Sequence, residues 1–295
     1  MSASGRMIEA FRRSSSAISL VIALSLLVMT LSTGYHIFAY TPSEFLERPD
    51  VQKYENAIET VSQMDEWTLT KFYWSNNLRI IGFYIVGIPS YFGFHSLIFN
   101  EYTIGMSTSY WYHAYGVEVF LIFLSGLFIH GVLELTGIFI VAAITLRVAW
   151  NFWKGMGHIM TPAGKRKKWS WGLSKGEKRK IRRHEGKVKE LLVDFLVLAS
   201  FGAFLVFLAA PIEAYISPSL MAVFVGALPL AIIFLVIIAF FYLSIFVWGL
   251  GAMKRDIKAV YGDVKFAFER KWRPTQLSLL IFVIFFSIMV ISLLV

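Results

Sequence analysis

Three ionisable residues occur in parts of the sequence that are otherwise strongly apolar. His130 and Glu134 share one apolar stretch, and Glu213 follows the end of another. A spacing of four residues places His130 and Glu134 on one face of a helix, where they could share a proton or bind one metal ion. Charged groups are costly inside a bilayer, and those found there often serve a function. These three residues are therefore the candidate site, with a divalent metal ion, a proton or a small polar solute as its ligand.

Three asparagines border the apolar stretch that precedes this candidate site. Asn76 and Asn77 come directly before residues 78–99, and Asn100 follows them. An asparagine at such a position can cap a helix end, which is the interpretation that spacing alone favours. The alternative is that the three amides line a polar cavity, and we include them among the candidate binding residues.

The composition indicates a membrane protein. Hydrophobic residues make up 57 % of the chain, aromatic residues 17 %, and the mean hydropathy is +0.64, values that exceed those of soluble domains. An apolar stretch of about 20 residues can cross a bilayer as a helix. The sequence therefore predicts an all-α, polytopic transmembrane helical bundle in which residues 1–295 form a single domain. About six hydrophobic segments are expected, at residues 16–40, 78–99, 116–150, 191–212, 219–250 and 275–295.

Charge predicts the orientation of these segments. Residues 151–190 and 251–274 form basic loops, and twelve Lys or Arg stand against two acids between residues 165 and 189. Such segments remain in the cytoplasm of multi-pass cell-membrane proteins, together with the N-terminus here. Residues 41–71 carry seven acids and three bases and are expected outside. Their apolar residues recur at helical spacing, as in an amphipathic helix at the membrane interface: Phe45, Leu46, Val51, Tyr54, Ile58, Val61 and Met64.

This orientation requires the chain to cross the membrane an odd number of times between residues 71 and 165. The two apolar segments in this range therefore cannot both be ordinary spans. One solution breaks residues 116–150, about 52 Å long as a straight helix, at His130-Gly131. The other makes residues 78–99 re-entrant. We favour the second, because residues 100–115 lack Lys and Arg and are rich in Tyr and Trp, as an outer interface would be. Its helix breakers would be Gly87, Pro89 and Gly93. Both solutions place a polar pocket near His130.

The second half of the sequence contains two further expectations about polar groups. Pro211 lacks an amide hydrogen, so it should free a carbonyl in the preceding turn and bend the helix beside Glu213. The chain should then reverse at Ser217-Pro218. Asp194, which follows several lysines, is expected to pair with Lys or Arg rather than to act chemically.

Other ligand classes are restricted by composition. The chain contains no cysteine, which excludes disulfides and thiolate ligands. The basic loops are expected to contact anionic lipid headgroups rather than nucleic acid, because they lie between membrane segments. The first basic cluster consists of Lys165, Arg166, Lys167 and Lys168. A homodimer is the default for symmetric assembly.

Several of these residues together resemble the stage II sporulation protein M (SpoIIM) family, over roughly residues 72–218. The resemblance is carried by Ser75-Asn76-Asn77, by Asn100, by His130-Gly131-Val132-Leu133-Glu134, and by the segment from Pro211 to Pro218. Families of this pattern usually show Pro before the His-Gly pair and Gly after the closing Asn, where this chain has Ile129 and Glu101. The resemblance implies an integral membrane protein. The member of the family known from sporulation looks like a membrane scaffold that gathers peptidoglycan-degrading enzymes at a septum.

Three functions are compatible with these observations. The first is a transport or channel-like protein that binds a cation, proton or small polar solute at a broken helix. The second is a scaffold that recruits partner proteins, with the same polar residues locking helices together. The third is an intramembrane metal-dependent hydrolase, with Glu134 as general base and His130 as ligand. The enzyme ranks last, because the sequence offers few metal ligands.

Overall fold

A computed structural model describes residues 3–87, 92–160 and 175–269, and within these ranges it contains helices and no strand. The predicted all-α fold is therefore confirmed. The elements are α1 (Ala3–Ala39), α2 (Pro42–Leu46), α3 (Pro49–Ser62), α4 (Glu66–Val86), α5 (Phe92–Tyr115), α6 (Val117–Met160), α7 (Lys175–Pro211), a π-helical turn (Ile212–Ile216), α8 (Ser217–Gly226) and α9 (Leu228–Glu269).

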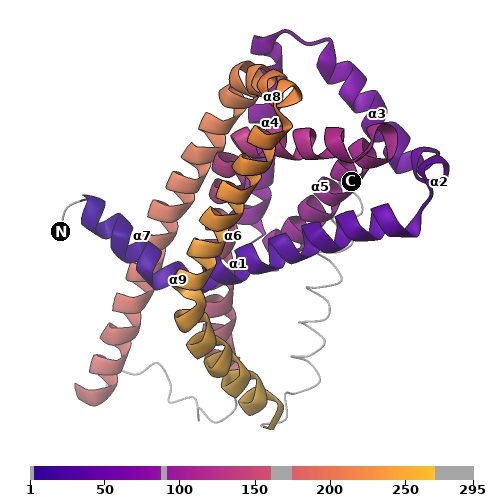
Figure 1. Ribbon diagram of the computed structural model, residues 1–295. Coiled ribbons are helices and arrows are strands. Elements are labelled where there is room, and N and C mark those ends of the chain that lie inside the picture. The colour runs from indigo at the N-terminus through magenta and orange to yellow at the C-terminus, as the bar shows by residue number, and fades with distance from the viewer. Residues whose placement is uncertain (1–2, 88–91, 161–174, 270–295) are drawn as a thin grey trace.

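Four stretches of the described chain are helical, long and apolar enough to cross a membrane: Ser4–Ala39, Val117–Asn151, Val188–Gly226 and Leu228–Arg255. They belong to α1, α6, α7 with α8, and α9. Figure 1 shows α7 rising to α8 and α9 descending from it, with α1 crossing both. The predicted segment at residues 275–295 and the four basic residues from Lys165 to Lys168 lie outside the described ranges.

The predicted segment at residues 78–99 is divided between two helices. α4 ends at Val86, where the amide of Gly87 still donates to the carbonyl of Phe83, and α5 begins at Phe92. Gly87 therefore ends a helix as predicted, whereas Gly93 lies in the first turn of α5. Pro89 lies outside the described ranges. Six segments and a re-entrant course remain predictions.

The alternative break at His130-Gly131 is wrong, because α6 continues through both residues over its 44 residues. Glycine in a helix interior costs only about 0.5–1 kcal/mol relative to alanine and removes no hydrogen bond. The preceding residue is Ile129 rather than proline, so every amide in this part of the helix can donate.

The expected reversal at Ser217-Pro218 is also wrong. Ser217 and Pro218 are the first two residues of α8, where the missing amide hydrogen of proline removes no helical hydrogen bond. The chain reverses instead at Ala227, which has an extended φ of −149° and separates α8 from α9.

The outer acidic segment folds as two short helices, α2 and α3, rather than as one helix on the membrane surface. Phe45 and Val51 are buried in a cluster with Met106 and Tyr110 of α5. The ring of Tyr54 meets that of Tyr110 at 5.5 Å between centroids. The apolar face predicted to meet the interface is thus largely covered by α5, which leaves the acidic face of α3 exposed.

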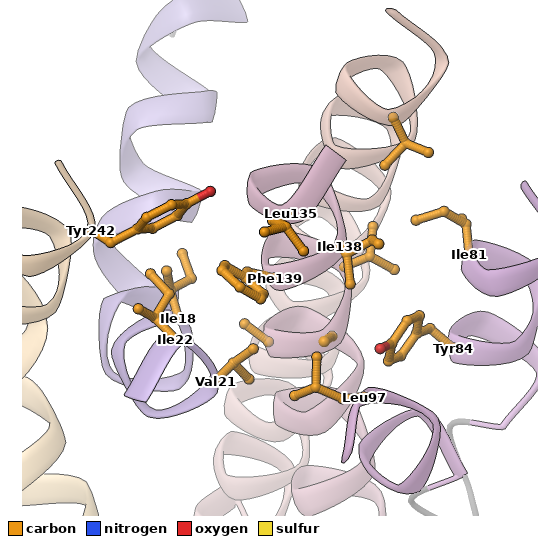
Figure 2. Close-up of a cluster of buried hydrophobic side chains, with 14 of the residues drawn as sticks. Ile18, Val21, Ile22, Ile81, Tyr84, Leu97, Leu135, Ile138, Phe139 and Tyr242 are labelled. Atoms are coloured by element: carbon orange, nitrogen blue, oxygen red, sulfur yellow. The ribbon is translucent and has the colours of Figure 1, made fainter. Parts of the chain in front are cut away.

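The core lies where α1, α4, α5 and α9 pack around α6. Ile138, Val141 and Ala143 of α6 are fully buried there. Figure 2 shows Ile18, Val21 and Ile22 of α1, Tyr242 of α9, and Ile81 and Tyr84 of α4 surrounding Leu135, Ile138 and Phe139 of α6. Helix α6 is therefore the central element of the bundle, and it carries two of the three candidate residues.

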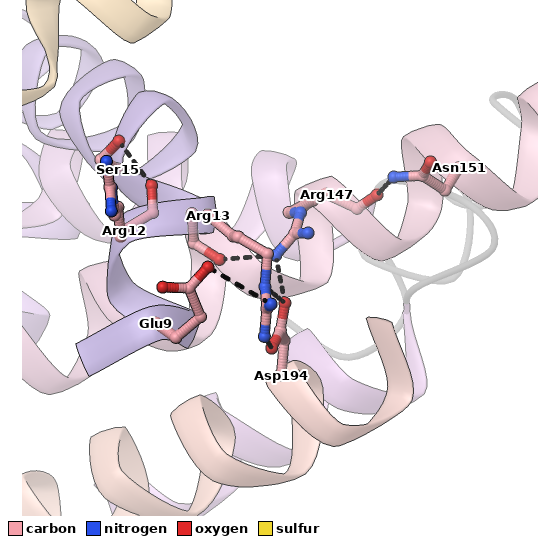
Figure 3. Close-up of polar contacts among 8 residues, drawn as sticks. Glu9, Arg12, Arg13, Ser15, Arg147, Asn151 and Asp194 are labelled. Carbon is pink, nitrogen blue, oxygen red and sulfur yellow. Dashed lines mark hydrogen bonds and ion pairs between the residues drawn. The ribbon is translucent and has the colours of Figure 1, made fainter. Parts of the chain in front are cut away.

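A charged network joins α1, α6 and α7 (Figure 3). Asp194 of α7 is fully buried and accepts two hydrogen bonds from Arg13, at 2.9 and 2.6 Å. Arg147 of α6 donates to the same carboxylate at 2.9 Å and to Ser14 at 2.9 Å. Asp194 therefore pairs with two arginines, which confirms the predicted pairing with Lys or Arg.

Candidate functional site

The imidazole of His130 lies between two polar side chains from a distant part of the chain. His130 is 7 % exposed, and its Nε2 atom lies 3.4 Å from Oε1 of Glu213. On the other side of the ring, Nδ1 lies 3.1 Å from Oγ of Ser217. The ring therefore connects α6 to the π-helical turn and to the first residue of α8.

The hydroxyl of Ser217 contacts both the imidazole of His130 and a backbone carbonyl. Its oxygen lies 3.2 Å from the carbonyl of Ile212, to which it can donate its hydrogen. In the tautomer with hydrogen on Nδ1, the ring donates to Ser217. In a neutral imidazole this leaves a lone pair on Nε2, directed at the carboxyl group of Glu213. A proton shared by these two atoms, or a cation bound by both, would join α6 to the π-helical turn.

Glu134 completes a group of three ligands. One ligand atom from each of His130, Glu134 and Glu213 lies within 4.8 Å of the other two. Glu134 is one turn beyond His130 on α6, and Glu213 comes from the π-helical turn. An imidazole nitrogen and two carboxylates are donors that bind divalent transition metals. The three residues singled out from the sequence are thus close together in the structure.

None of the three asparagines lies at a helix end, and one of them faces the candidate site. Asn76 and Asn77 lie inside α4, which begins at Glu66 with Asp65 as its cap, and Asn100 lies inside α5. The capping prediction is therefore wrong, since these helices begin elsewhere. Asn77 is 2 % exposed and faces Glu134, while its Nδ2 atom makes no hydrogen bond.

Asn76 and Asn100 do not contact the three ligands directly. The amide of Asn76 donates to Oδ1 of Asn77 at 3.4 Å and its oxygen accepts from Arg79 at 3.2 Å. Asn76 is therefore a neighbour of the site rather than part of it. The side chain of Asn100 lies beside the carboxyl group of Glu101 on its own helix.

Two site residues, Tyr73 and Ser217, were missed by reasoning from the sequence. Tyr73 of α4 faces the carboxyl group of Glu213, and Ser217 holds the imidazole. Both stand four residues from a candidate, Tyr73 before Asn77 and Ser217 after Glu213. That spacing indicates a shared helix face and was the available signal.

Pro211 ends α7 two residues before Glu213, where the chain changes to a π-helical turn. Because proline has no amide hydrogen, the carbonyl of Phe207 one turn earlier is free. That carbonyl accepts a hydrogen bond of 2.8 Å from Nε1 of Trp74, whose ring stacks on Phe207 at 4.6 Å between centroids. The π-helical turn then carries Glu213, as such turns do at functional sites. The predicted free carbonyl is confirmed, and it ties α7 to α4.

Replacing Trp74 by Phe is expected to destabilise the protein by about 1 kcal/mol, because an aromatic ring is kept while the hydrogen bond to Phe207 is lost. Thermal unfolding of the detergent-solubilised protein measures this loss. Trp67, on the same helix and 52 % exposed, provides the control, and Trp67→Phe should leave the melting temperature unchanged. Equal effects of the two substitutions would contradict the role of the Trp74 hydrogen bond.

Helices α6 and α7 approach most closely one turn beyond Glu134. A Cβ atom built on Gly137 would lie 2.5 Å from the carbonyl oxygen of Gly202, and one on Gly202 would lie 2.6 Å from the carbonyl oxygen of Gly137. The backbones can be this close only because both residues lack a side chain.

Comparison with known proteins gives one positive result. The family model described as stage II sporulation protein M matches residues 20–218. This range contains His130, Glu134, Glu213 and all three asparagines. Neither the curated proteins nor the solved structures yielded a match.

Proposed function

The chain belongs to the stage II sporulation protein M family and is a membrane protein, and from this premise we propose that it is a transport protein. Its substrate is a divalent cation, which His130, Glu134 and Glu213 bind between helices. Transporters commonly place such sites where a helix departs from regular geometry, as the π-helical turn does here. The N-terminus and the basic loops face the cytoplasm in this proposal.

The single observation that carries the proposal is the convergence of three ligand residues. One ligand atom from each of His130, Glu134 and Glu213 lies within 4.8 Å of the other two. Nδ1 of His130 lies 3.1 Å from Oγ of Ser217, and metal-binding imidazoles are typically oriented by such a contact at the far nitrogen.

The donor set favours a divalent ion over a monovalent one. Two carboxylates balance two positive charges, so a bound divalent ion leaves the buried site neutral. Oxygen and nitrogen ligands lie about 2.0–2.2 Å from such an ion. Ligand atoms now within 4.8 Å of one another would move together by about 1 Å to reach these distances.

The same geometry supports a hydrolase less well than it supports a transporter. A catalytic metal needs about three protein ligands and an open position for water. If Glu134 acts as general base, only His130 and Glu213 of this group remain as ligands.

A scaffold is the second candidate, and the exposed acidic face of α3 favours it. Asp50, Glu55 and Glu59 lie exposed on this helix, while its apolar face is covered by α5. Such a charged surface can recruit a basic partner protein. In that function His130, Glu134 and Glu213 would only hold helices together.

Metal content distinguishes these functions. After dialysis against trace Mn²⁺, Co²⁺ and Zn²⁺, mass spectrometry of the purified protein should find about one divalent ion per chain, because three ligands converge. His130→Ala and Glu213→Gln should lose the ion, whereas Glu118→Gln, an exposed change at the start of α6, should keep it. A folded parent protein without metal, or variants that retain it, would refute the cation site.

A further inference from the structure

A second group of buried polar atoms lies in the bundle at a different place. Glu101 of α5 and Ser25 of α1 are 1 % exposed, and Tyr84 of α4 is fully buried. Oε1 of Glu101, Oγ of Ser25 and the hydroxyl of Tyr84 make no hydrogen bond. Three oxygen atoms from three helices are thus buried together without partners.

The hydroxyl groups of Ser25 and Tyr84 each lie near the carboxyl group of Glu101. Ser25 and Asn100 lie beside the Glu101 carboxyl group, and Tyr84 faces the same carboxyl group with Ser96 next to its hydroxyl. Figure 2 shows Tyr84 reaching from α4 toward the bundle interior, with its hydroxyl oxygen directed inward. Leu97, Ile81 and other apolar residues surround it.

No basic residue neutralises Glu101 in the described part of the chain. The ion pairs found there join other residues, and the carboxyl group of Glu101 is close enough to Glu134 of α6 to interact with it electrostatically. A buried carboxylate without a partner is strongly unfavourable. A buried hydroxyl without a hydrogen bond costs about 1–3 kcal/mol. A bound ligand that contacts all three oxygens would remove these penalties together.

The donor chemistry restricts the ligand. Carboxylate and hydroxyl oxygens are hard donors, and this group offers no imidazole. It carries a single negative charge, so one monovalent cation gives a neutral buried site. The first site, with two carboxylates and an imidazole, differs in both respects.

We propose that Glu101, Ser25 and Tyr84 form a separate binding site for a monovalent metal cation of the sodium class between α1, α4 and α5. The two sites share no residue, so each can be removed by substitution without changing a ligand of the other. A transporter that holds both would bind two kinds of cation in one bundle.

The experiment compares melting temperatures of the solubilised protein in NaCl, KCl and choline chloride at equal ionic strength. Sodium should stabilise the parent protein relative to choline. Glu101→Gln should abolish this difference, and Ser25→Ala and Tyr84→Phe should each raise the sodium concentration for half-maximal stabilisation at least tenfold. Glu118→Gln is the control and should respond like the parent.

The outcomes separate this proposal from the divalent site. Glu101→Gln should keep its divalent ion, whereas His130→Ala should lose that ion and keep the sodium response. If Glu101→Gln fails to fold, Ser25→Ala still tests the site. A parent protein that melts at the same temperature in sodium and choline, or a Ser25→Ala variant with an unchanged sodium response, would overturn the proposal.

Discussion

Gly137→Ala is expected to lower the melting temperature sharply and to abolish divalent metal binding at the same time. The new Cβ atom would lie 2.5 Å from the carbonyl oxygen of Gly202, which is backbone and cannot rotate away. Helices α6 and α7 must therefore separate, at a cost of about 1–3 kcal/mol or more. Because Glu134 lies one turn before Gly137 and Glu213 follows α7, this separation moves the ligands apart.

A matched glycine elsewhere provides the control. Gly251 lies inside α9, and a Cβ atom there would meet nothing within 4 Å. Gly251→Ala should leave stability unchanged or raise it slightly, because alanine favours the helix. Thermal unfolding and metal content of the two variants are compared. If Gly137→Ala melted like Gly251→Ala, the close crossing of α6 and α7 would be refuted.

Asp194→Asn is expected to destabilise the protein by about 3 kcal/mol, the second large effect. The substitution keeps the shape of a fully buried side chain but removes the negative charge that Arg13 and Arg147 share. Breaking a buried ion pair typically costs about 3–5 kcal/mol. The lower end applies here, because the side chains of Arg13 and Arg147 are 32 % and 23 % exposed and can reach water. Thermal unfolding in detergent measures the loss.

The exposed ion pair of the outer segment is the control for charge removal. Asp50 pairs with Arg48 at 2.6 Å, and its side chain is 46 % exposed. Asp50→Asn should cost less than about 1 kcal/mol, as exposed pairs do. Equal melting temperatures of the two Asn variants would contradict the account of Asp194 as the charged link between three helices.

The parts of this protein that could be predicted from the sequence are those governed by length, charge or a missing backbone group. Apolar length predicted the helices that can cross a membrane, and the position of Asp194 after several lysines predicted its ion pairs. The missing amide of Pro211 predicted the free carbonyl of Phe207. The apolar length and the missing amide each act on their own element, whereas the arginines that pair with Asp194 come from two other helices.

The remaining features depend on contacts between elements. Helix α6 continues through Gly131, and Pro218 is accommodated in the first turn of α8. A single glycine or an early proline destabilises a helix by less than the packing of that helix stabilises it. The sequence suggests that Asn77 caps a helix, because an apolar stretch begins directly after it. Helix α4 in fact begins eleven residues earlier, inside a segment that looks polar. The outer helices are covered by α5, a contact between segments 50 residues or more apart that no local pattern reveals.

The most direct test of the transport proposal is divalent cation flux into proteoliposomes. Vesicles with the purified protein and an entrapped fluorescent metal indicator should fill faster than empty vesicles when Mn²⁺, Co²⁺ or Zn²⁺ is added. Glu134→Gln should reduce this flux to the level of empty vesicles, while Glu118→Gln should preserve it. A correctly folded, metal-binding parent protein whose flux equals that of empty vesicles, or a Glu134→Gln variant with undiminished flux, would contradict the transport function.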